Sequence, residues 1–469
     1  MWEADARLRR AVHDGRPGML EALAGWVGVP SVSAVPGHRP DVVRSARWLA
    51  SALRSTGFPV VEVWETDGLP AVYAHWPAED AGAPTLLVYS HHDVHAVKDG
   101  EWRETSPFSP VVREGRMYGR GASDAKGQTL CHLWALRAHM AAGRRAPAVG
   151  VTLLVEGEEE IGSVHLADLL AAHREQLAAD VVMVSDTMLW SLTDAAVCTG
   201  VRGSVNGRLE VRGADADVHS GAVAGTAPNA CTELCRLLGL LHDEKGRVTL
   251  PGFYDAVAPL SRRERAELDA LPFDEAAWLA DSHTRSVRGE HGRSVLERIW
   301  TRPSVEVSSL LGGDAEQPSR GVIPPTARAD LLLRLVPEQT ADEVARQLRR
   351  WLEDHRVAGY DYELTVSSTI SDPYLTPTGH PAAVALEGAM SRALGRPPLR
   401  MRNGGAAPAA QLARETGAPV VFFGTGLVDD RWHGHDEKVE IRALLQGAET
   451  LAYFLEDLAS AMGRPGRVS

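Results

Sequence analysis

The sequence is poor in the features that mark secreted and membrane-embedded proteins. Only four of its 469 residues are cysteines, too few for a disulfide framework in a chain of this length. No apolar run approaches the roughly 20 residues that cross a bilayer, and the first ten residues lack the apolar core of a signal peptide. We therefore expect a cytoplasmic protein with no membrane partner.

Positive charge is also in deficit. The chain has 62 acidic and 49 basic residues, a formal net charge of −13 at pH 7. This balance repels a phosphate backbone, so we expect no nucleic-acid partner. With 44% hydrophobic and 24% charged residues, the composition is that of a soluble globular protein. The length suggests two or three domains.

The most informative stretch is an apolar run, residues 149–155, followed directly by acidic residues 156 and 158–160. The apolar run predicts a buried strand. Carboxylates packed together at the end of such a strand repel one another and lose hydration unless cations hold them. A solvated acidic turn is the alternative interpretation.

Two further apolar runs, residues 85–89 and 180–184, end in the same way. The first is followed by three histidines and an aspartate, which include His91, Asp93 and His95. The second is followed by Asp186. In an H-x-D arrangement, a carboxylate can fix the orientation of a metal-binding histidine. Ligands collect beyond the carboxyl ends of parallel strands. The polar residues that follow each of these predicted strands therefore favour one metal site at a sheet edge.

Asp124 lies in a glycine-rich segment, residues 117–127, that fits neither of the common phosphate-loop patterns. An amphipathic helix is expected to follow, through residues 130–140. Asp124 could therefore be an ordinary N-cap residue of that helix or one of the metal ligands.

The order of the predicted elements indicates an α/β fold, a mostly parallel mixed sheet with helices on both faces. From about residue 205 the strands alternate between apolar and polar residues, which indicates an antiparallel sheet in an inserted, smaller α+β domain. A charged helical insertion is expected at 261–300, and an apolar run at 419–423 returns to the first sheet. We therefore predict a catalytic domain in two parts, residues 1–204 and 371–469, around a lid or dimerisation domain, residues 205–370.

Seven segments occur in an order that resembles the M20 metallopeptidases, particularly their dipeptidase branch, over about residues 15–460. They are YSHHDVHAV, YGRGASDAKGQ, VEGEEEIGS, VMVSD, DVHSG, GVIPP with LLLRLVP, and HGHDEK. The fold that this resemblance implies is a di-metal exopeptidase type with an inserted lid.

The resemblance implies two divalent metal ions per subunit. His91 and Asp186 would hold one ion, Glu160 and His433 would hold the other, and Asp124 would bridge them. Oxygen and imidazole ligands suit zinc, manganese or cobalt, so the ligand set does not select the metal.

The same resemblance assigns catalytic roles. Glu159 would be the general base that takes a proton from water as it attacks the amide carbonyl of a small peptide, and Asp93 would support His91. His219 would stabilise the oxyanion, reaching the site of the partner subunit in a homodimer. Arg334 would grip the substrate carboxylate, beside a loop at Gly404 and Gly405.

Two positions depart from the pattern of the dipeptidase branch. Gly321 stands where a threonine is usual, and Ala406 stands where the Gly-Gly-Ser-type loop has serine. These two lost hydroxyls suggest a changed or roomier substrate site. An aminoacylase acting on N-acyl amino acids is the rival activity. An inactive hydrolase-fold binding protein is less favoured, because all five expected ligands and Glu159 are present.

Overall fold

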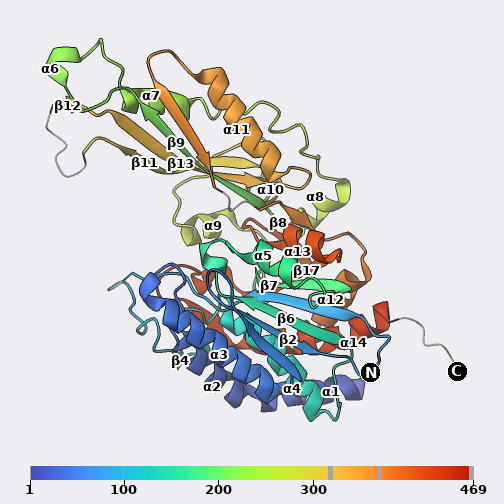
Figure 1. Cartoon of the computed structure of the whole chain (residues 1–469). Coiled ribbons are helices and arrows are strands. Elements are labelled where there is room, and N and C mark those ends of the chain that lie inside the picture. Colours follow the sequence, from blue (N-terminus) through green and yellow to red (C-terminus); the bar gives the residue numbers. More distant parts are fainter. Residues whose placement is uncertain (1, 99, 315–320, 368–370, 464–469) are drawn as a thin grey trace.

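The computed structural model describes residues 2–98, 100–314, 321–367 and 371–463. Its secondary structure gathers around two main sheets, which lie in the lower and the upper part of Figure 1. We call them the large sheet and the small sheet.

The large sheet has six strands in the order β1-β2-β6-β3-β7-β17. Their bounds are β1 (Val60–Trp64), β2 (Ala71–Trp76), β3 (Thr85–His91), β6 (Gly150–Glu156), β7 (Val181–Met188) and β17 (Val420–Gly426). Strands β6, β3, β7 and β17 are parallel neighbours, whereas β1 and β2 pair antiparallel. The predicted mixed, mostly parallel sheet is confirmed.

Helices cover both faces of the large sheet. Alternate residues of β3 pack on opposite sides, Leu86 and Val88 on one core and Leu87 and Tyr89 on the other. A strand buried on both faces reads as a continuous apolar run. The first core is covered by α1 (Trp2–Asp14), α2 (Arg16–Val27), α3 (Arg39–Thr56), α4 (Lys126–Ala141), α12 (Pro381–Leu394) and α14 (Ile441–Met462), and the second by α5 (Leu166–Ala172) and α13 (Ala409–Thr416).

The parallel pairing positions the functional residues. Because β6, β3, β7 and β17 run in the same direction, their carboxyl ends meet at one edge of the large sheet. The predicted strand at 180–184 is too short, since β7 extends to Met188. Pairing with β17 as far as Met188 supports this extension, and Asp186 therefore lies within the strand.

The small sheet is antiparallel, with the order β11-β13-β9-β14. Its strands are β9 (Gly203–Arg212), β11 (Ser304–Gly312), β13 (Thr326–Leu335) and β14 (Asp361–Val366), and it packs on α7 (Ala230–Gly239) and α11 (Ala341–His355). Buried and more exposed residues alternate along β9, as its sequence predicts. At the far end lie the β10–β12 pair and α6, with bounds β10 (Val218–His219), α6 (Ser220–Val223) and β12 (Val322–Ile323).

The charged insertion forms α8 (Arg262–Asp269), α9 (Glu275–Asp281) and α10 (Val295–Thr301). The expected start at Ser261 is confirmed by a capping box with Glu264. Leu268 and Trp300 share a core with Met401, which lies in a three-stranded sheet of β8 (Ala196–Val201), β15 (Tyr374–Leu375) and β16 (Leu399–Asn403). The insertion thus packs on the part of the chain that leads back to the large sheet.

The predicted domain limits stay a prediction. Strand β9 begins two residues before the limit at 204/205, and residues 368–370, beside the second limit, lie outside the described residues. The remaining short elements are β4 (Val111–Arg113), β5 (Arg116–Tyr118), β18 (Lys438–Glu440) and the 3-10 turns Pro36–His38, Glu159–Ile161 and Val428–Asp430. In the described residues, no helix has the length and apolar character needed to cross a membrane.

Candidate metal centre and active site

The structure brings the five predicted metal ligands together at the carboxyl edge of the large sheet. His91 ends β3, Glu160 follows β6, and Asp186 lies near the end of β7. Asp124 precedes α4, and His433 follows β17. Their ligand atoms form two groups, each within 4.8 Å: His91 with Asp124 and Asp186, and Glu160 with His433 and His95.

The first group is buried around the ring of His91. Its Nε2 lies 3.1 Å from Oδ1 of Asp124 and 3.8 Å from Oδ1 of Asp186. Burial raises the pKa of Asp186, and the negative charge of Asp124 adds to this rise, against the opposing attraction of His91. An imidazole and two carboxylates that converge from separate segments suit a divalent cation.

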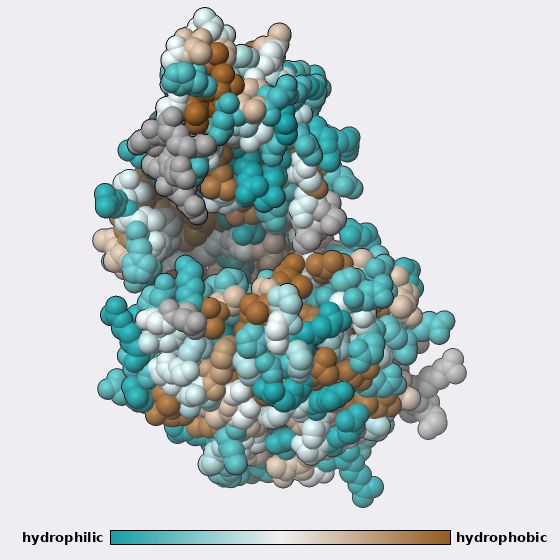
Figure 2. All heavy atoms as spheres, turned by 60° about the vertical axis from the view of Figure 1, so that its left-hand side comes forward, coloured by the Kyte–Doolittle hydropathy of each residue, from teal (hydrophilic) through white to brown (hydrophobic). Residues whose placement is uncertain are grey.

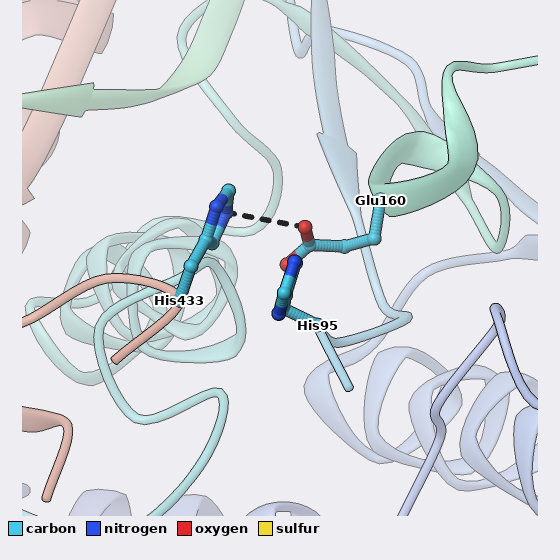
Figure 3. A group of neighbouring side chains, drawn as sticks. All are labelled: His95, Glu160 and His433. Atoms are coloured by element: carbon cyan, nitrogen blue, oxygen red, sulfur yellow. Dashed lines mark ion pairs between the residues drawn. The ribbon is translucent and has the colours of Figure 1, made fainter. Parts of the chain in front are cut away.

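The second group is centred on His433. Its Nε2 lies 3.2 Å from Oδ2 of Asp124 and 3.2 Å from Oε2 of Glu160. Figure 3 shows the side chains of Glu160 and His433 pointing toward one another. Hydrogen bonds to the two carboxylates raise the pKa of His433 to about 10. Asp124 therefore faces one group with Oδ1 and the other with Oδ2, as a bridging ligand must.

Two carboxylate oxygens test whether these residues fit cations. Oε1 of Glu160 and Oδ1 of Asp186 are buried and have no hydrogen-bond partner within the described part of the chain. Burial, together with the negative charge of Asp124, raises the pKa of Glu160 to about 7. Buried carboxylates without donors are costly. Divalent ions would satisfy both oxygens, so the residues fit a metal centre.

Asp93 contacts both groups of predicted ligands and is not itself a predicted ligand. Its Oδ1 lies 3.4 Å from Nδ1 of His91. The same carboxylate accepts hydrogen bonds from the backbone N–H groups of Glu159 and Glu160, at 3.2 and 3.1 Å. Burial would raise the pKa of Asp93, but hydrogen bonding and the charge of His91 bring it below its usual value. Asp93 therefore stays ionised and orients residues of both groups.

Glu159 lines a cleft together with Glu160 and His433, two of the predicted metal ligands. Burial raises its pKa well above the ordinary value. The charges of Asp186, Glu160 and Asp124 act in the same direction, against the opposing charge of His91. A carboxylate so placed accepts a proton readily, as a general base requires.

Glu437 is a supporting residue that the sequence reasoning missed, although it lies within the HGHDEK segment. Its carboxylate accepts from the backbone N–H groups of Ser123 and Asp124, at 3.0 and 3.1 Å, and pairs with Arg120 at 2.7 Å. The alternative role of Asp124 as a helix N-cap is wrong. Helix α4 begins at Lys126 without a side-chain cap, and the Asp124 carboxylate faces the two histidines instead.

Two of the predicted metal ligands, Glu160 and His433, line a cleft of about 670 Å³ between the large and small sheets, and Figure 2 shows the surface hollowed between the two parts of the molecule. Glu159, Glu160 and His433 form one wall, and Arg334 of β13 lines the cleft from the small sheet. Burial, followed by the charge of Arg334, lowers the pKa of nearby Arg202 to about 10. Across residues 2–98, 100–314, 321–367 and 371–463, Arg334 has no ion-pair or hydrogen-bond partner. The cleft can therefore accept an anionic group.

The predicted glycine loop, at Gly404 and Gly405, is held by Arg202. The carbonyls of Gly404 and Gly405 accept from Arg202, at 2.8 and 2.9 Å, and the N–H of Gly405 donates to Asn403. The next residue, Ala406, lines the cleft itself. The two predicted glycines thus shape the loop, and Ala406, which follows them, borders the cleft.

His219 does not reach the cleft of its own chain. It is exposed on β10, at the end of the small sheet far from the large sheet (Figure 1). Gly321 lies beside it, since its carbonyl accepts from Ser220 N–H and the next residue, Val322, pairs with His219. The φ angle of Gly321 is +66°, a conformation that disfavours threonine.

Comparison with known proteins adds independent evidence. The family model described as Peptidase family M20/M25/M40 matches residues 87–457. The human Beta-Ala-His dipeptidase is 28% identical over 94% of this chain and 90% of its own length. The Cys-Gly metallodipeptidase DUG1 of Candida albicans is 27% identical over 95% of each chain. The structure of an M20 family metallo-carboxypeptidase, Sso-CP2 from Sulfolobus solfataricus, superposes with a TM-score of 0.86 at 27% identity, over 94% of this chain and 99% of the other.

Proposed function

Because the chain belongs to peptidase family M20/M25/M40, we propose that it hydrolyses the amide bond of dipeptides or short peptides with a free carboxylate. Membership confirms the metallopeptidase class that the sequence motifs predict. The relatives with dipeptidase names match nearly the whole chain, which supports the dipeptide as substrate.

One observation carries this proposal. The second cluster of proposed metal-binding side chains, with Glu160 and His433, and Arg334, which has no partner in the part of the chain that the structure describes, line the same cleft from opposite sides. A short peptide can place its scissile amide at the clusters only if its free carboxylate is held elsewhere in the cleft. The guanidinium of Arg334 offers a two-pronged donor for that carboxylate.

The residues divide the reaction between them. A pair of divalent ions, when bound, supplies Lewis acidity that lowers the pKa of water and polarises the amide carbonyl. Glu159 takes a proton from the attacking water and returns it to the leaving amine nitrogen. Asp93 keeps His91 and the backbone of Glu160 in place while the charge on the carbonyl oxygen changes.

The metal content and the assembly belong to the same proposal. We expect two ions per subunit, zinc or manganese with cobalt as a third choice, held by His91, Asp124, Glu160, Asp186 and His433. A homodimer is supported by edge strand β11, which exposes Val307, Leu310 and Leu311 at 42%, 53% and 48%. An apolar edge strand invites pairing with another chain. A cytoplasmic location stays a prediction from composition.

The proposal is tested by amine release from a panel of substrates after chelation and metal restoration. The panel holds α-dipeptides, β-alanyl dipeptides, tripeptides, dipeptide amides and N-acetyl amino acids. We expect metal-restored cleavage of dipeptides and little cleavage of their amides. Activity confined to the N-acetyl compounds would instead assign an aminoacylase.

A further inference from the structure

The three histidines of the HHDVH segment have different surroundings. The ring of His91 belongs to the first metal group, and the ring of His92 is buried, with Nε2 2.9 Å from the carbonyl oxygen of Pro70. His95 lies in the cleft, and its ligand atom is within 4.8 Å of those of Glu160 and His433. Figure 3 shows His95 beside the carboxylate of Glu160 and the ring of His433.

The hydrogen bonding of His95 leaves one nitrogen available. Its Nδ1 lies 3.0 Å from the carbonyl oxygen of Ala96. A carbonyl only accepts, so Nδ1 must carry the hydrogen, and in the neutral ring Nε2 holds the lone pair. Nε2 has no hydrogen-bond partner among the side chains and backbone that the structure describes. Such a backbone contact is how metal-binding histidines are commonly oriented.

The carboxylate of Glu160, beside His95, also has an atom without a partner in the described part of the chain. Oε2 of Glu160 faces His433, but buried Oε1 has no hydrogen-bond partner within residues 2–98, 100–314, 321–367 and 371–463. The rings of His95 and His433 lie with centroids 4.3 Å apart. Two imidazoles and a carboxylate oxygen thus surround one space, and Asp124 reaches the same place with Oδ2, 3.2 Å from His433.

We propose that His95 is a further ligand of the ion held by Glu160 and His433, so that the two metal positions are chemically unequal. This inference rests on the proposed metal centre. One position would have a single imidazole, His91, with the carboxylates of Asp186 and Asp124. The other would have two imidazoles with Glu160 and Asp124. Imidazole favours zinc, cobalt or nickel, whereas carboxylate-rich sites suit manganese, so the His95 position selects zinc over manganese more strongly.

Metal binding without substrate tests this assignment. Metal-free wild-type protein, His95→Ala and His95→Phe are titrated with Zn²⁺ and Mn²⁺ by calorimetry, and Co²⁺ absorption spectra report the coordination. His95→Phe keeps a ring against His433 but has no ligand atom. We expect two ions in the wild type. In both variants we expect one Zn²⁺ affinity to fall at least tenfold, with an altered Co²⁺ spectrum, while the other affinity is kept.

The outcomes separate this inference from the proposed function. If His95→Phe binds both ions with wild-type affinity and spectrum, His95 only packs against His433, and the assignment as a ligand is overturned. If the wild type itself binds no pair of ions, the proposed metal centre fails and the role of His95 fails with it. His433→Ala is the positive control, because it removes a ligand already expected at the same position.

Discussion

The carboxylate of Asp93 accepts a hydrogen bond from the backbone N–H of Glu160 at 3.1 Å. The same carboxylate lies 3.4 Å from Nδ1 of His91. Asp93 thus connects the end of β3 with the turn after β6, and each of these segments carries a proposed ligand of a different ion. One buried side chain therefore fixes the positions of His91 and Glu160 relative to each other.

Asp93→Asn is expected to weaken metal binding. Asparagine keeps the size of the side chain, but its amide presents one acceptor oxygen and no negative charge. It therefore cannot both support His91 and accept from the turn of Glu160. Loss of such a supporting group typically costs about 10–100-fold in metal affinity or activity. Calorimetric titration with Zn²⁺ measures this, and unchanged affinity would show that Asp93 is only a packing residue.

Glu159→Gln is expected to abolish turnover while the metal content stays intact. The general base contributes about 10²–10⁴-fold to the rate, and no ligand atom is removed. Glu158→Gln is the matched control from the same acidic run, because Glu158 accepts from Leu69 N–H at 2.9 Å and contacts His165, outside the cleft. Activity and bound metal are measured together. An active Glu159→Gln enzyme would mean that another residue is the base.

The placement of the metal ligands was predictable where it depends on strand ends. Apolar runs that finish in His91, Glu160 and Asp186 lie on neighbouring parallel strands, so their exits meet at one edge. The contact of His95 with His433, and of Glu437 with the segment before α4, could not be predicted. Both depend on how distant loops pack after folding, and neither has a periodic pattern. The length of β7 depends on its pairing with β17 and not on its own hydrophobicity.

Arg334→Ala is expected to impair the binding of substrates that carry a free carboxylate. A hydrogen bond to a charged group is worth about 1.5–3 kcal/mol, so KM for a dipeptide should rise by roughly 10–150-fold, while a dipeptide amide is little affected. Arg208→Ala is the control, since Arg208 on β9 pairs with Asp330 outside the cleft. Equal losses for the acid and the amide would rule out carboxylate recognition by Arg334.

Glu156→Gln is expected to flatten the pH dependence of stability. Burial raises the pKa of Glu156 from 4.5 to about 7. Between these values the folded state keeps a proton that the unfolded chain has lost, so the free energy of unfolding falls as pH rises through this window. Glutamine does not titrate, and its amide oxygen can still accept from Ser163 and Tyr89, as Oε1 of Glu156 does.

Denaturant unfolding of the metal-free protein at pH 5 and pH 7.5 measures this effect. On going to the higher pH, the free energy of unfolding of the variant should fall by up to about 3 kcal/mol less than that of the wild type. The proposed metal ligands titrate in both proteins, so the difference isolates Glu156. Glu363→Gln, at an exposed position on β14, is the control. Parallel pH profiles for the wild type and Glu156→Gln would contradict the burial of a protonated carboxyl.

Mixing Glu159→Gln with His219→Ala is expected to restore activity that neither variant has alone. His219 is exposed at the end of the small sheet and lies outside the cleft of its own chain, so we expect it to act in a partner's site. In a mixed dimer, the subunit with intact Glu159 would face the intact His219 of the other subunit. Random exchange makes half of the dimers mixed, each with one working site of two, or about a quarter of wild-type activity.

Light scattering establishes whether dimers form, and refolding the two variants together ensures that subunits exchange. Leu310→Glu on edge strand β11 should weaken the dimer and lower the recovered activity in parallel, because a charge replaces an exposed apolar contact. Confirmed mixed dimers without activity would mean that His219 does not serve the partner's site. The oxyanion would then have to be stabilised by groups already in the cleft.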